Sequence, residues 1–437
     1  MEKIILEQNP WWRNKEELLD DEKVKTALKK KKPLLYTFKE KQNILFIGPR
    51  QVGKTTFFKL LIYDLLFNKK IKPNKICYFS CELLKNFKEI VELFRKFSLF
   101  ADPKYIFLDE ISFVKDWNKS VKYLLDSNIL KNKVVYLTGS SSLELKKERF
   151  PGRNIKIKYF LPLSFRDFIN IFGSKQIKKE VKENQIEFKN NKEIFEKTKK
   201  LIVFKEELDK LFYKFLQSGG FPRSFYELIE KGKIKNETYE IYWNWLISDI
   251  AKLERSEKIA VGVIEGIIKN YGTKFSLSSI AKETEIGSHI TVRDYLEILE
   301  NLLAVRNFYN FSLSKKKVIF RKMRKTYFID PFILYSCNFK LFGIPYDDYS
   351  KIVESIVIEL LIRKFDTLRA GFYHNRKEVD LCFDDFGIEV KWQEKVDKKD
   401  FPKINIKNKI LISKNEFEFI KNHNLMIVPT SVFLSLI

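Results

Sequence analysis

Residues 43–62 read NILFIGPRQVGKTTFFKLLI, which is an apolar strand, a glycine-containing turn and an apolar helix in succession. The turn fits the pattern G-x-x-x-x-G-K-[ST], whose backbone N–H groups cradle phosphates. Glycine at positions 48 and 53 permits backbone angles and close approaches that a side chain would block. The stretch therefore predicts a P-loop for a nucleotide. Its predicted binding residues are Gly48, Pro49, Arg50, Gln51, Val52, Gly53, Lys54, Thr55 and Thr56.

Two of these residues carry most of the chemistry. A lysine at the position of Lys54 reaches the β and γ phosphates of ATP, and a hydroxyl at Thr55 is a Mg²⁺ ligand. The helix that begins here directs its positive dipole end at the anion. ATP and Mg²⁺ are the cofactors that this pattern predicts.

A second apolar run, Tyr105 to Leu108, ends in Asp109 and Glu110. About fifty residues after a P-loop, this arrangement is typical of a Walker B strand. We expect Asp109 to hold the Mg²⁺ shell, and Glu110 to orient and deprotonate the attacking water.

Two further polar segments follow this strand. Strand Val134 to Thr138 runs into a serine-rich turn, where we expect Ser140 to sense the γ-phosphate. Thr138 and Ser141 are alternatives, and these hydroxyls could instead cap the next helix. Farther on, Arg153, in preference to Arg149, is the predicted arginine that stabilises charge in phosphoryl transfer. The alternative is a plain surface arginine. If the arginine acts on a neighbouring subunit, the chain forms a homo-oligomeric ring.

Short apolar strands alternate with helical stretches from residue 43 to about 161, which predicts a parallel sheet covered on both faces. The expected fold is α/β, with a small helical and winged-helix region and a small α/β domain after the sheet. We place a P-loop domain with its N-terminal segment at 1–165, a helical region at 166–260, a winged-helix-like domain at 261–335 and a final domain at 336–437. The charged stretch 173–200 reads as a solvated helical insertion or mobile flap.

Lysine and arginine exceed aspartate and glutamate by 25, and DNA is a usual partner for such a basic chain. The wing of the winged-helix-like region carries a cluster of cations that could grip phosphates. A solvated basic loop, in a protein that is simply lysine-rich, is the alternative. The candidate DNA-binding residues are Lys315, Lys316, Lys317, Arg321, Lys322, Arg324 and Lys325.

Segments 378–383 and 388–392 flank a turn and predict a β-hairpin. Folding at residues 384–387 places Asp380 across from Lys391, with Glu389 on the same face. Two carboxylates beside a lysine are typical of a Mg²⁺-dependent nuclease site, to which an upstream helix could add Glu354. The alternative is a half-exposed hairpin with charged outer positions.

Composition excludes some other classes. The four cysteines are dispersed without metal-binding spacing, and no apolar run reaches the length of a membrane span. The N-terminus lacks the order of a signal peptide. We therefore expect a cytoplasmic protein with no membrane partner.

The quoted motifs together resemble the prokaryotic AAA+ superfamily ATPases that bear a C-terminal domain of unknown function 4143. The motifs are GPRQVGKTT, YIFLDEI, LTGSSS, PGR with LPLSF, GGFP, EVDLCF and IEVKW. The resemblance implies an AAA-like core, a winged-helix-like middle and a fold similar to PD-(D/E)xK endonucleases. It matches Lys54, Thr55, Asp109 and Glu110 to an ATP site, and Asp380, Glu389 and Lys391 to a nuclease core. The sequence departs from the family's pattern in having no proline before Asp380 and no evident sensor arginine on a helical lid.

Three functions follow as hypotheses. The first is a Mg²⁺-dependent ATPase that binds and acts on DNA, including branched DNA. The second is a nucleotide switch that binds a protein client. The third is an ATP-regulated DNA endonuclease.

Overall fold

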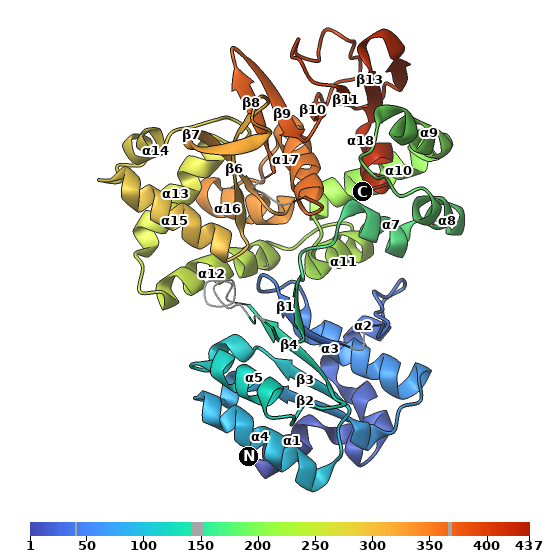
Figure 1. The fold of residues 1–437 in the computed structure, drawn as a ribbon, viewed down its shortest axis with the longest axis vertical. Helices are drawn as coiled ribbons and strands as arrows, with labels where there is room; N and C mark the ends of the chain where they lie inside the picture. Colours follow the sequence, from blue (N-terminus) through green and yellow to red (C-terminus); the bar gives the residue numbers. More distant parts are fainter. Residues whose placement is uncertain (40–41, 141–149, 151, 366–368) are drawn as a thin grey trace. The chain divides into compact units, whose positions relative to one another are not determined.

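The computed structural model describes residues 1–437 except 40, 41, 141–149, 151 and 366–368, and it leaves the side chains of 321 and 322 undescribed. The chain forms two compact units, Met1–Leu161 and Pro162–Ile437 (Figure 1). No helix in the described ranges is long and apolar enough to cross a membrane. All four cysteines are buried free thiols.

The first unit is built around a five-stranded parallel sheet in the order β2-β3-β4-β1-β5. The four strands from β2 to β1 are almost wholly buried, and the edge strand β5 is largely exposed. The predicted parallel sheet is confirmed, and each strand lies within two residues of its expected bounds. The strands are β1 (Asn43–Ile47), β2 (Ile76–Ser80), β3 (Tyr105–Asp109), β4 (Val134–Gly139) and β5 (Ile155–Tyr159).

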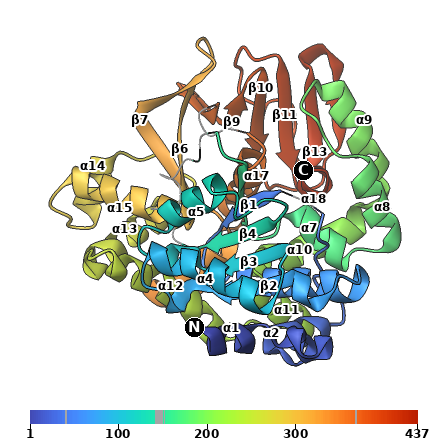
Figure 2. The same cartoon turned by 60° about the horizontal axis from the view of Figure 1, so that its bottom comes forward.

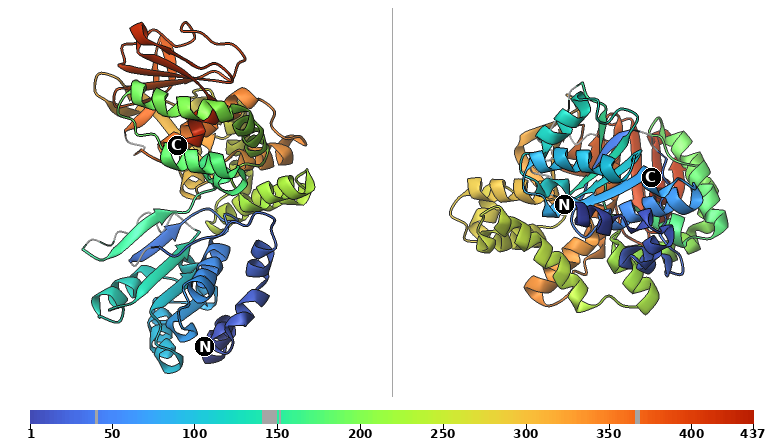
Figure 3. Two further views of the ribbon diagram at one scale, coloured as in Figure 1. Left: turned by 90° about the vertical axis from the view of Figure 1, so that its right-hand side faces the viewer. Right: turned by 90° about the horizontal axis from the view of Figure 1, so that it is seen from below.

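Helices cover both faces of this sheet (Figure 3, left). On one face, Phe58 of α3 packs with Phe107 and Tyr136 of the strands, and Trp11 from the N-terminal segment joins this core. The opposite face is covered by α4 and α5 around Leu108 and other strand residues. The helices are α1 (Glu2–Gln8), α2 (Glu22–Leu28), α3 (Lys54–Tyr63), α4 (Phe87–Phe100) and α5 (Trp117–Asp126).

The second unit contains a helical region and a mixed sheet of eight strands. Its helices are α7 (Phe165–Phe172), α8 (Lys175–Glu183), α9 (Asn191–Leu201), α10 (Lys205–Ser218), α11 (Pro222–Lys231), α12 (Asn236–Lys252), α13 (Glu257–Lys269), α14 (Leu277–Glu283), α15 (His289–Asn301), α16 (Pro331–Phe342), α17 (Tyr349–Ile362) and α18 (Thr430–Ser435). Its strands are β6 (Val305–Ser312), β7 (Lys317–Phe328), β8 (Ala370–Asn375), β9 (Lys377–Phe383), β10 (Phe386–Val390), β11 (Asn408–Ser413), β12 (Glu418–Ile420) and β13 (Leu425–Pro429).

The sheet of the second unit runs in the order β12-β13-β11-β10-β9-β8-β6-β7 (Figure 2). The hairpin β6–β7 forms in the segment where the sequence predicted a wing, and it follows α14 and α15 directly. One parallel pair, Asn310 with Phe372, joins this hairpin to β8. The wing and the C-terminal strands therefore share one sheet, although the sequence pattern placed them on either side of a boundary at residue 335.

The register of the β9–β10 hairpin differs from the predicted one. We expected Leu381 opposite Val390, whereas the structure pairs Leu381 with Ile388 and Phe383 with Phe386. The turn is only two residues long, and Asp384 adopts a φ of 44° there. The shift by two residues keeps every side chain on its predicted face but moves Lys391 away from its expected position across from Asp380. The half-exposed hairpin of the alternative reading is also wrong, because Asp380 and Glu389 are both buried.

The charged segment 173–200 forms α8 and α9, as expected of a helical insertion, but it is packed against the sheet and is not a mobile flap. Phe188 stacks edge-on against Phe383 and Phe386 of the sheet. The side-chain amide of Asn191 donates to the carbonyls of Lys409 and Asn424 at 2.9 and 2.7 Å. Phe188 thus packs this segment against β9 and β10, and Asn191 fixes the start of α9 to β11 and to the residue before β13.

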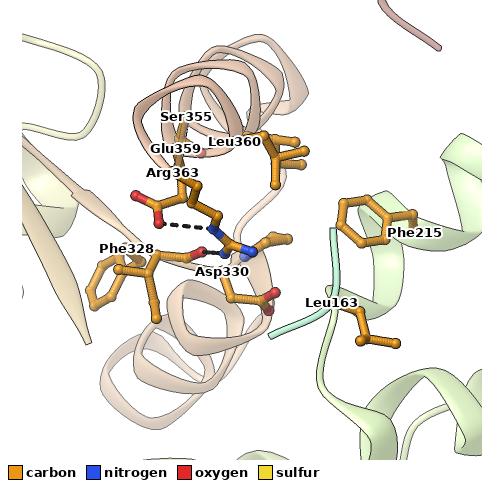
Figure 4. A pocket seen from close by; sticks show the side chains of 11 residues that line it. Leu163, Phe215, Phe328, Asp330, Ser355, Glu359, Leu360 and Arg363 are labelled. Carbon is orange, nitrogen blue, oxygen red and sulfur yellow. Dashed lines mark hydrogen bonds and ion pairs between the residues drawn. The ribbon is translucent and has the colours of Figure 1, made fainter. Parts of the chain in front are cut away.

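A buried polar centre holds α16 and α17 to the start of the second unit (Figure 4). Arg363 bridges Glu359 and the carbonyls of Pro162 and Ile329, and Asp330 accepts from the N–H groups of Gly220 and Phe332. A side chain on Gly219 would begin 2.0 Å from the Asp330 carboxylate. The cavity at this centre measures about 10 Å³, near the minimum for one water molecule. This centre is therefore structural, and it explains the GGFP motif.

Candidate functional site

The P-loop lies between β1 and α3, as the sequence predicted. Gly53 precedes the helix with a φ of 95°, and Gln51 also has a positive φ of 63°. Gly48 meets a different requirement, because a Cβ there would lie 2.1 Å from the carbonyl oxygen of Phe160. The loop thus combines left-handed backbone with a close approach to the end of β5, and both restrict the residue types that fit.

Lys54 opens α3 with its ammonium group buried inside the loop. Its Nζ donates to the carbonyls of Gly48 at 3.1 Å and Pro49 at 3.0 Å, and it lies 3.6 Å from Glu110 Oε1. Burial lowers the pKa of Lys54, and the carboxylates of Glu110 and Asp109 oppose this shift. A desolvated cation held only by carbonyls and one carboxylate is poised to exchange these contacts for phosphate oxygens.

Asp109 ends β3 and is fixed by two hydroxyl donors. Tyr78 from β2 donates to its Oδ2 at 3.0 Å, and Thr138 from β4 donates to its Oδ1. The parallel sheet brings these side chains together because the carboxyl ends of its strands lie at one edge. Asp109 is buried, yet its carboxylate is satisfied on both oxygens.

Glu110 lies just beyond β3 in an unusual backbone conformation, with a φ of 53°. Its N–H donates to Thr138 Oγ1 at 2.9 Å, and its Oε2 accepts from the Ser140 hydroxyl. Left-handed backbone in a non-glycine residue is uncommon and is found at functional sites. Both candidate hydroxyls thus bind the acidic pair: Thr138 contacts Asp109 and Glu110, and Ser140 contacts Glu110. Ser141 lies outside the described residues.

These residues fit a nucleotide with Mg²⁺. The loop's left-handed positions, the buried ammonium of Lys54 and the helix start at Thr55 form a cradle for anionic oxygens. Among the described residues no three His, Cys, Asp or Glu side chains converge as a metal site. A P-loop does not require three, because it supplies one hydroxyl and one carboxylate and the phosphates supply the rest. Thr55 and Asp109 are the residues that would hold the ion.

Arg153 is engaged by a carboxylate of its own unit. Its guanidinium donates to both oxygens of Asp126 on α5, at 3.0 and 2.7 Å. This bidentate pair raises the pKa of Arg153 above its ordinary value. An arginine finger at this position must leave Asp126 first. Arg149 lies outside the described residues.

Arg50 of the P-loop is near enough to Lys54 for its positive charge to lower the pKa of that lysine. The Arg50 guanidinium lies over the ring of Phe113, 5.6 Å from its centroid. Phe113 follows Glu110 by three residues, in the short helix Ile111–Phe113. This contact links the P-loop to the segment after the Walker B strand.

The second unit gathers the predicted nuclease residues into one cluster around Asp380. Its Oδ2 accepts from the N–H of Val390 at 3.0 Å, and its own N–H donates to Glu389 Oε2 at 3.4 Å. Lys391 Nζ lies 2.9 Å from Glu389 Oε1. Burial, and next the charge of Asp380, raise the pKa of Glu389 to about 8.

Lys325 occupies the interior of this cluster, which corrects its predicted role in DNA binding. Only 1% of its side chain is exposed, and its Nζ lies 2.9, 2.8 and 3.3 Å from Glu354, Glu378 and Asp380. An ammonium enclosed by three carboxylates cannot reach a DNA backbone. The sequence predicted DNA binding because Lys325 follows a run of cations. Its position on β7 instead directs the side chain inward.

Glu354, from α17, completes the cluster on the other side. Its Oε1 also accepts from the hydroxyl of Tyr327 at 2.6 Å. Burial raises the pKa of Glu354 to about 7, with Asp380 the next cause. Tyr327, Lys325 and Glu378 were missed from this site by sequence reasoning. The signal for Tyr327 and Lys325 is the alternation along β7, which places them two residues apart on one face.

The remaining cations of the wing divide into several groups. Lys315, Lys316 and Lys317 are exposed at the β6–β7 turn, and Lys316 is paired with Asp385. The guanidinium of Arg324 lies 5.2 Å from the ring centroid of Tyr309. The side chains of Arg321 and Lys322 lie outside the described residues.

Comparisons with known families match two segments of the chain. Residues 40–169 match an AAA domain, and residues 209–342 match a domain of unknown function, DUF8612. The first segment, which is similar to an AAA domain, spans the whole P-loop sheet. The second runs from α10 to α16 and stops before the carboxylates Glu354, Asp380 and Glu389.

Two proteins of similar sequence are the uncharacterized protein MJ1544 of Methanocaldococcus jannaschii and an uncharacterized protein of Haemophilus influenzae. The first is 29% identical over 78% of this chain and 71% of its own length. The second is 25% identical over 79% of this chain and 80% of its own length.

Among solved structures, the Orc1 protein of Aeropyrum pernix in complex with DNA is 13% identical, with a TM-score of 0.29 over 77% of this chain and 93% of that one. RuvB of Thermotoga maritima is 16% identical, with a TM-score of 0.26 over 61% of this chain and 81% of that one. At these TM-scores the structural similarity supports no conclusion about this chain.

Proposed function

We propose that the first unit hydrolyses ATP to ADP and phosphate with Mg²⁺. The observation that carries this proposal is the connected set Lys54, Asp109, Glu110, Thr138 and Ser140, in which each side chain bonds to another member. Lys54 exchanges loop carbonyls for phosphate oxygens. Glu110 accepts a proton from the attacking water at its carboxylate, and Ser140 orients that carboxylate. Bound Mg²⁺ supplies positive charge that offsets the charge developing on the phosphoryl oxygens.

Steady-state phosphate release tests this assignment. Lys54→Ala and Glu110→Gln should each reduce turnover at least about a hundredfold, which is the scale of losing a general base or a charge-stabilising donor. Lys75→Ala and Asp102→Asn form the matched control, because they remove an exposed lysine and carboxylate from the same unit. Unchanged turnover in Lys54→Ala would remove the assignment.

We further propose that DNA is the partner and that ATP turnover is coupled to the second unit's action on it. A formal net charge of +25 and the exposed run Lys315 to Lys317 support this partner. The order α14, α15 and the β6–β7 hairpin suits a winged-helix-like contact, in which wing cations bind phosphates without reading bases. A nucleotide-dependent protein client is the alternative partner, and DNA binding that is absent at low salt would favour it.

For the Asp380 cluster we propose a structural role instead of DNA cleavage. The observation that favours this role is Lys325, whose ammonium already neutralises the carboxylates that a nuclease would offer to Mg²⁺. Incubation of supercoiled plasmid with Mg²⁺ or Mn²⁺ should therefore leave it intact. Nicking by the wild type that Asp380→Asn abolishes would restore the nuclease assignment.

A further inference from the structure

A groove in the second unit lies between α14, the start of α15 and the sheet. It measures about 590 Å³, within the range of small-ligand sites. Phe275 and Phe372 form buried parts of its lining, whereas 52% of Phe320 and 42% of Met323 are exposed. Lys274, Arg324 and His289 bring basic side chains to the same groove. An open groove with aromatic walls and cations suits a planar, anionic ligand better than a purely apolar one.

A large bulge in β7 produces this exposure. Tyr309 pairs with Arg324, but the next residue of β6, Asn310, pairs with Ile319. Four residues of β7, Phe320 to Met323, therefore stand outside the ladder, and the sequence between the two apolar ends is Arg321-Lys322. Bulges re-aim side chains next to binding sites. This one presents an aromatic and a thioether side chain at the mouth of the groove.

The groove is built by contacts that fix its walls. Phe275 and Arg324 exchange backbone hydrogen bonds of 2.9 and 3.1 Å, which adds the segment before α14 to the edge of β7. The ring of Phe320 meets the ring of Tyr309 edge-on, with 4.9 Å between the ring centroids. Lys274 Nζ donates to Glu378 at 2.9 Å, which ties the groove to β9. These contacts hold the walls of the groove in place without a ligand.

His374 also lines the groove. Its Nδ1 is buried and makes no hydrogen bond within the part of the chain that the structure describes, and it lies 3.7 Å from Glu378 Oε2.

We propose that this groove binds an unpaired nucleotide of DNA, with its base on Phe320 and its phosphate beside Arg324, while Met323 separates it from the neighbouring base. This inference rests on the proposed function, since it names the DNA structure that the second unit recognises. Every base has a stacking face, and aromatic platforms bind unpaired strands without sequence preference. Apolar side chains that insert between bases also open base steps. The groove should therefore bind unpaired positions in preference to continuous duplex.

Fluorescence anisotropy with the full chain tests the proposal. The probes are a labelled 30-base-pair duplex and the same duplex with a three-nucleotide bubble that carries 2-aminopurine. Wild type should bind the bubble roughly tenfold more tightly, because stacking one base contributes about that factor. The 2-aminopurine fluorescence should fall on binding as the base stacks.

Variants distinguish binding in the groove from the general affinity for DNA. Phe320→Ala and Met323→Ala should lose the bubble preference and keep duplex affinity, and Phe320→Trp should retain the preference. Phe342→Ala is the matched control, because Phe342 is an exposed phenylalanine of α16 outside the groove. Equal binding of bubble and duplex by wild type, or a preference that survives Phe320→Ala with Met323→Ala, would overturn this inference and leave DNA binding intact. Failure to bind either probe at low salt would overturn the proposed function as well.

Discussion

Thr138 is a residue whose role the sequence only partly indicated. It was an alternative sensor, and the structure makes its hydroxyl the link between Asp109 and the backbone of Glu110. We expect Thr138→Val to reduce ATP turnover roughly 10–100-fold, the cost of losing a group that orients a metal or catalytic ligand. Ser120→Ala is the control, because it removes another buried hydroxyl of the same unit. Turnover equal to that of the control would argue against the orienting role.

Lys325 is a second residue with a sharp prediction. Lys325→Met keeps the length of the side chain but leaves the carboxylates Glu354, Glu378 and Asp380 without their central cation. Removing one partner from a buried charge cluster costs about 3–5 kcal/mol of unfolding free energy. Urea denaturation followed by tryptophan fluorescence measures this loss. Lys315→Met on the exposed turn should change stability by less than about 0.5 kcal/mol, and an equal effect of the two variants would contradict the account.

Asp330 links stability to pH. Burial raises its pKa to about 7, above the value of about 3.9 in an unfolded chain. The folded protein therefore favours the protonated carboxyl, so this contribution is fully present below pH about 4 and is lost as pH rises through about 7. Asp330→Asn, which keeps the helix cap, should make the melting temperature less dependent on pH across this window. Parallel pH profiles of the two proteins would refute the assignment.

At the scale of elements, the turn of the β6–β7 hairpin and the inner face of β7 carry cations in different environments. Lys315 to Lys317 are exposed at its turn, whereas Lys325 faces the carboxylates beneath it. Lys315 to Lys317 should therefore contribute to binding phosphates, and Lys325 should not.

The salt dependence of duplex affinity tests this division. Each phosphate contact that is lost reduces the slope of log affinity against log salt by about 0.9, so the triple change Lys315→Ala, Lys316→Ala and Lys317→Ala should lower it by up to about 2.7. The control replaces Lys231, Lys233 and Lys235 with Ala, at the end of α11 and before α12. An unchanged slope in the wing variant would show that the turn makes no phosphate contact.

At the scale of the whole molecule, sequence patterns predicted what is local and missed what is formed by distant segments. The P-loop is readable because a strand, a glycine turn and a helix follow one another within twenty residues. The strands of the first sheet are readable because each is a short run in the local sequence. The inward position of Lys325, the packing of Phe188 on β9 and β10, and the two-residue turn at Asp384 depend on partners far along the chain or on backbone angles. Charge clustering alone cannot separate a solvated lysine from one enclosed by carboxylates.

The measurement that tests the central claim most directly is steady-state ATP hydrolysis by the full chain at fixed salt, with and without linear and bubble-containing DNA. Glu110→Gln supplies the background. The account predicts measurable basal turnover that rises when DNA is added and that the variant lacks. Basal turnover that does not respond to either DNA would contradict the claim that the P-loop unit acts on DNA through the second unit.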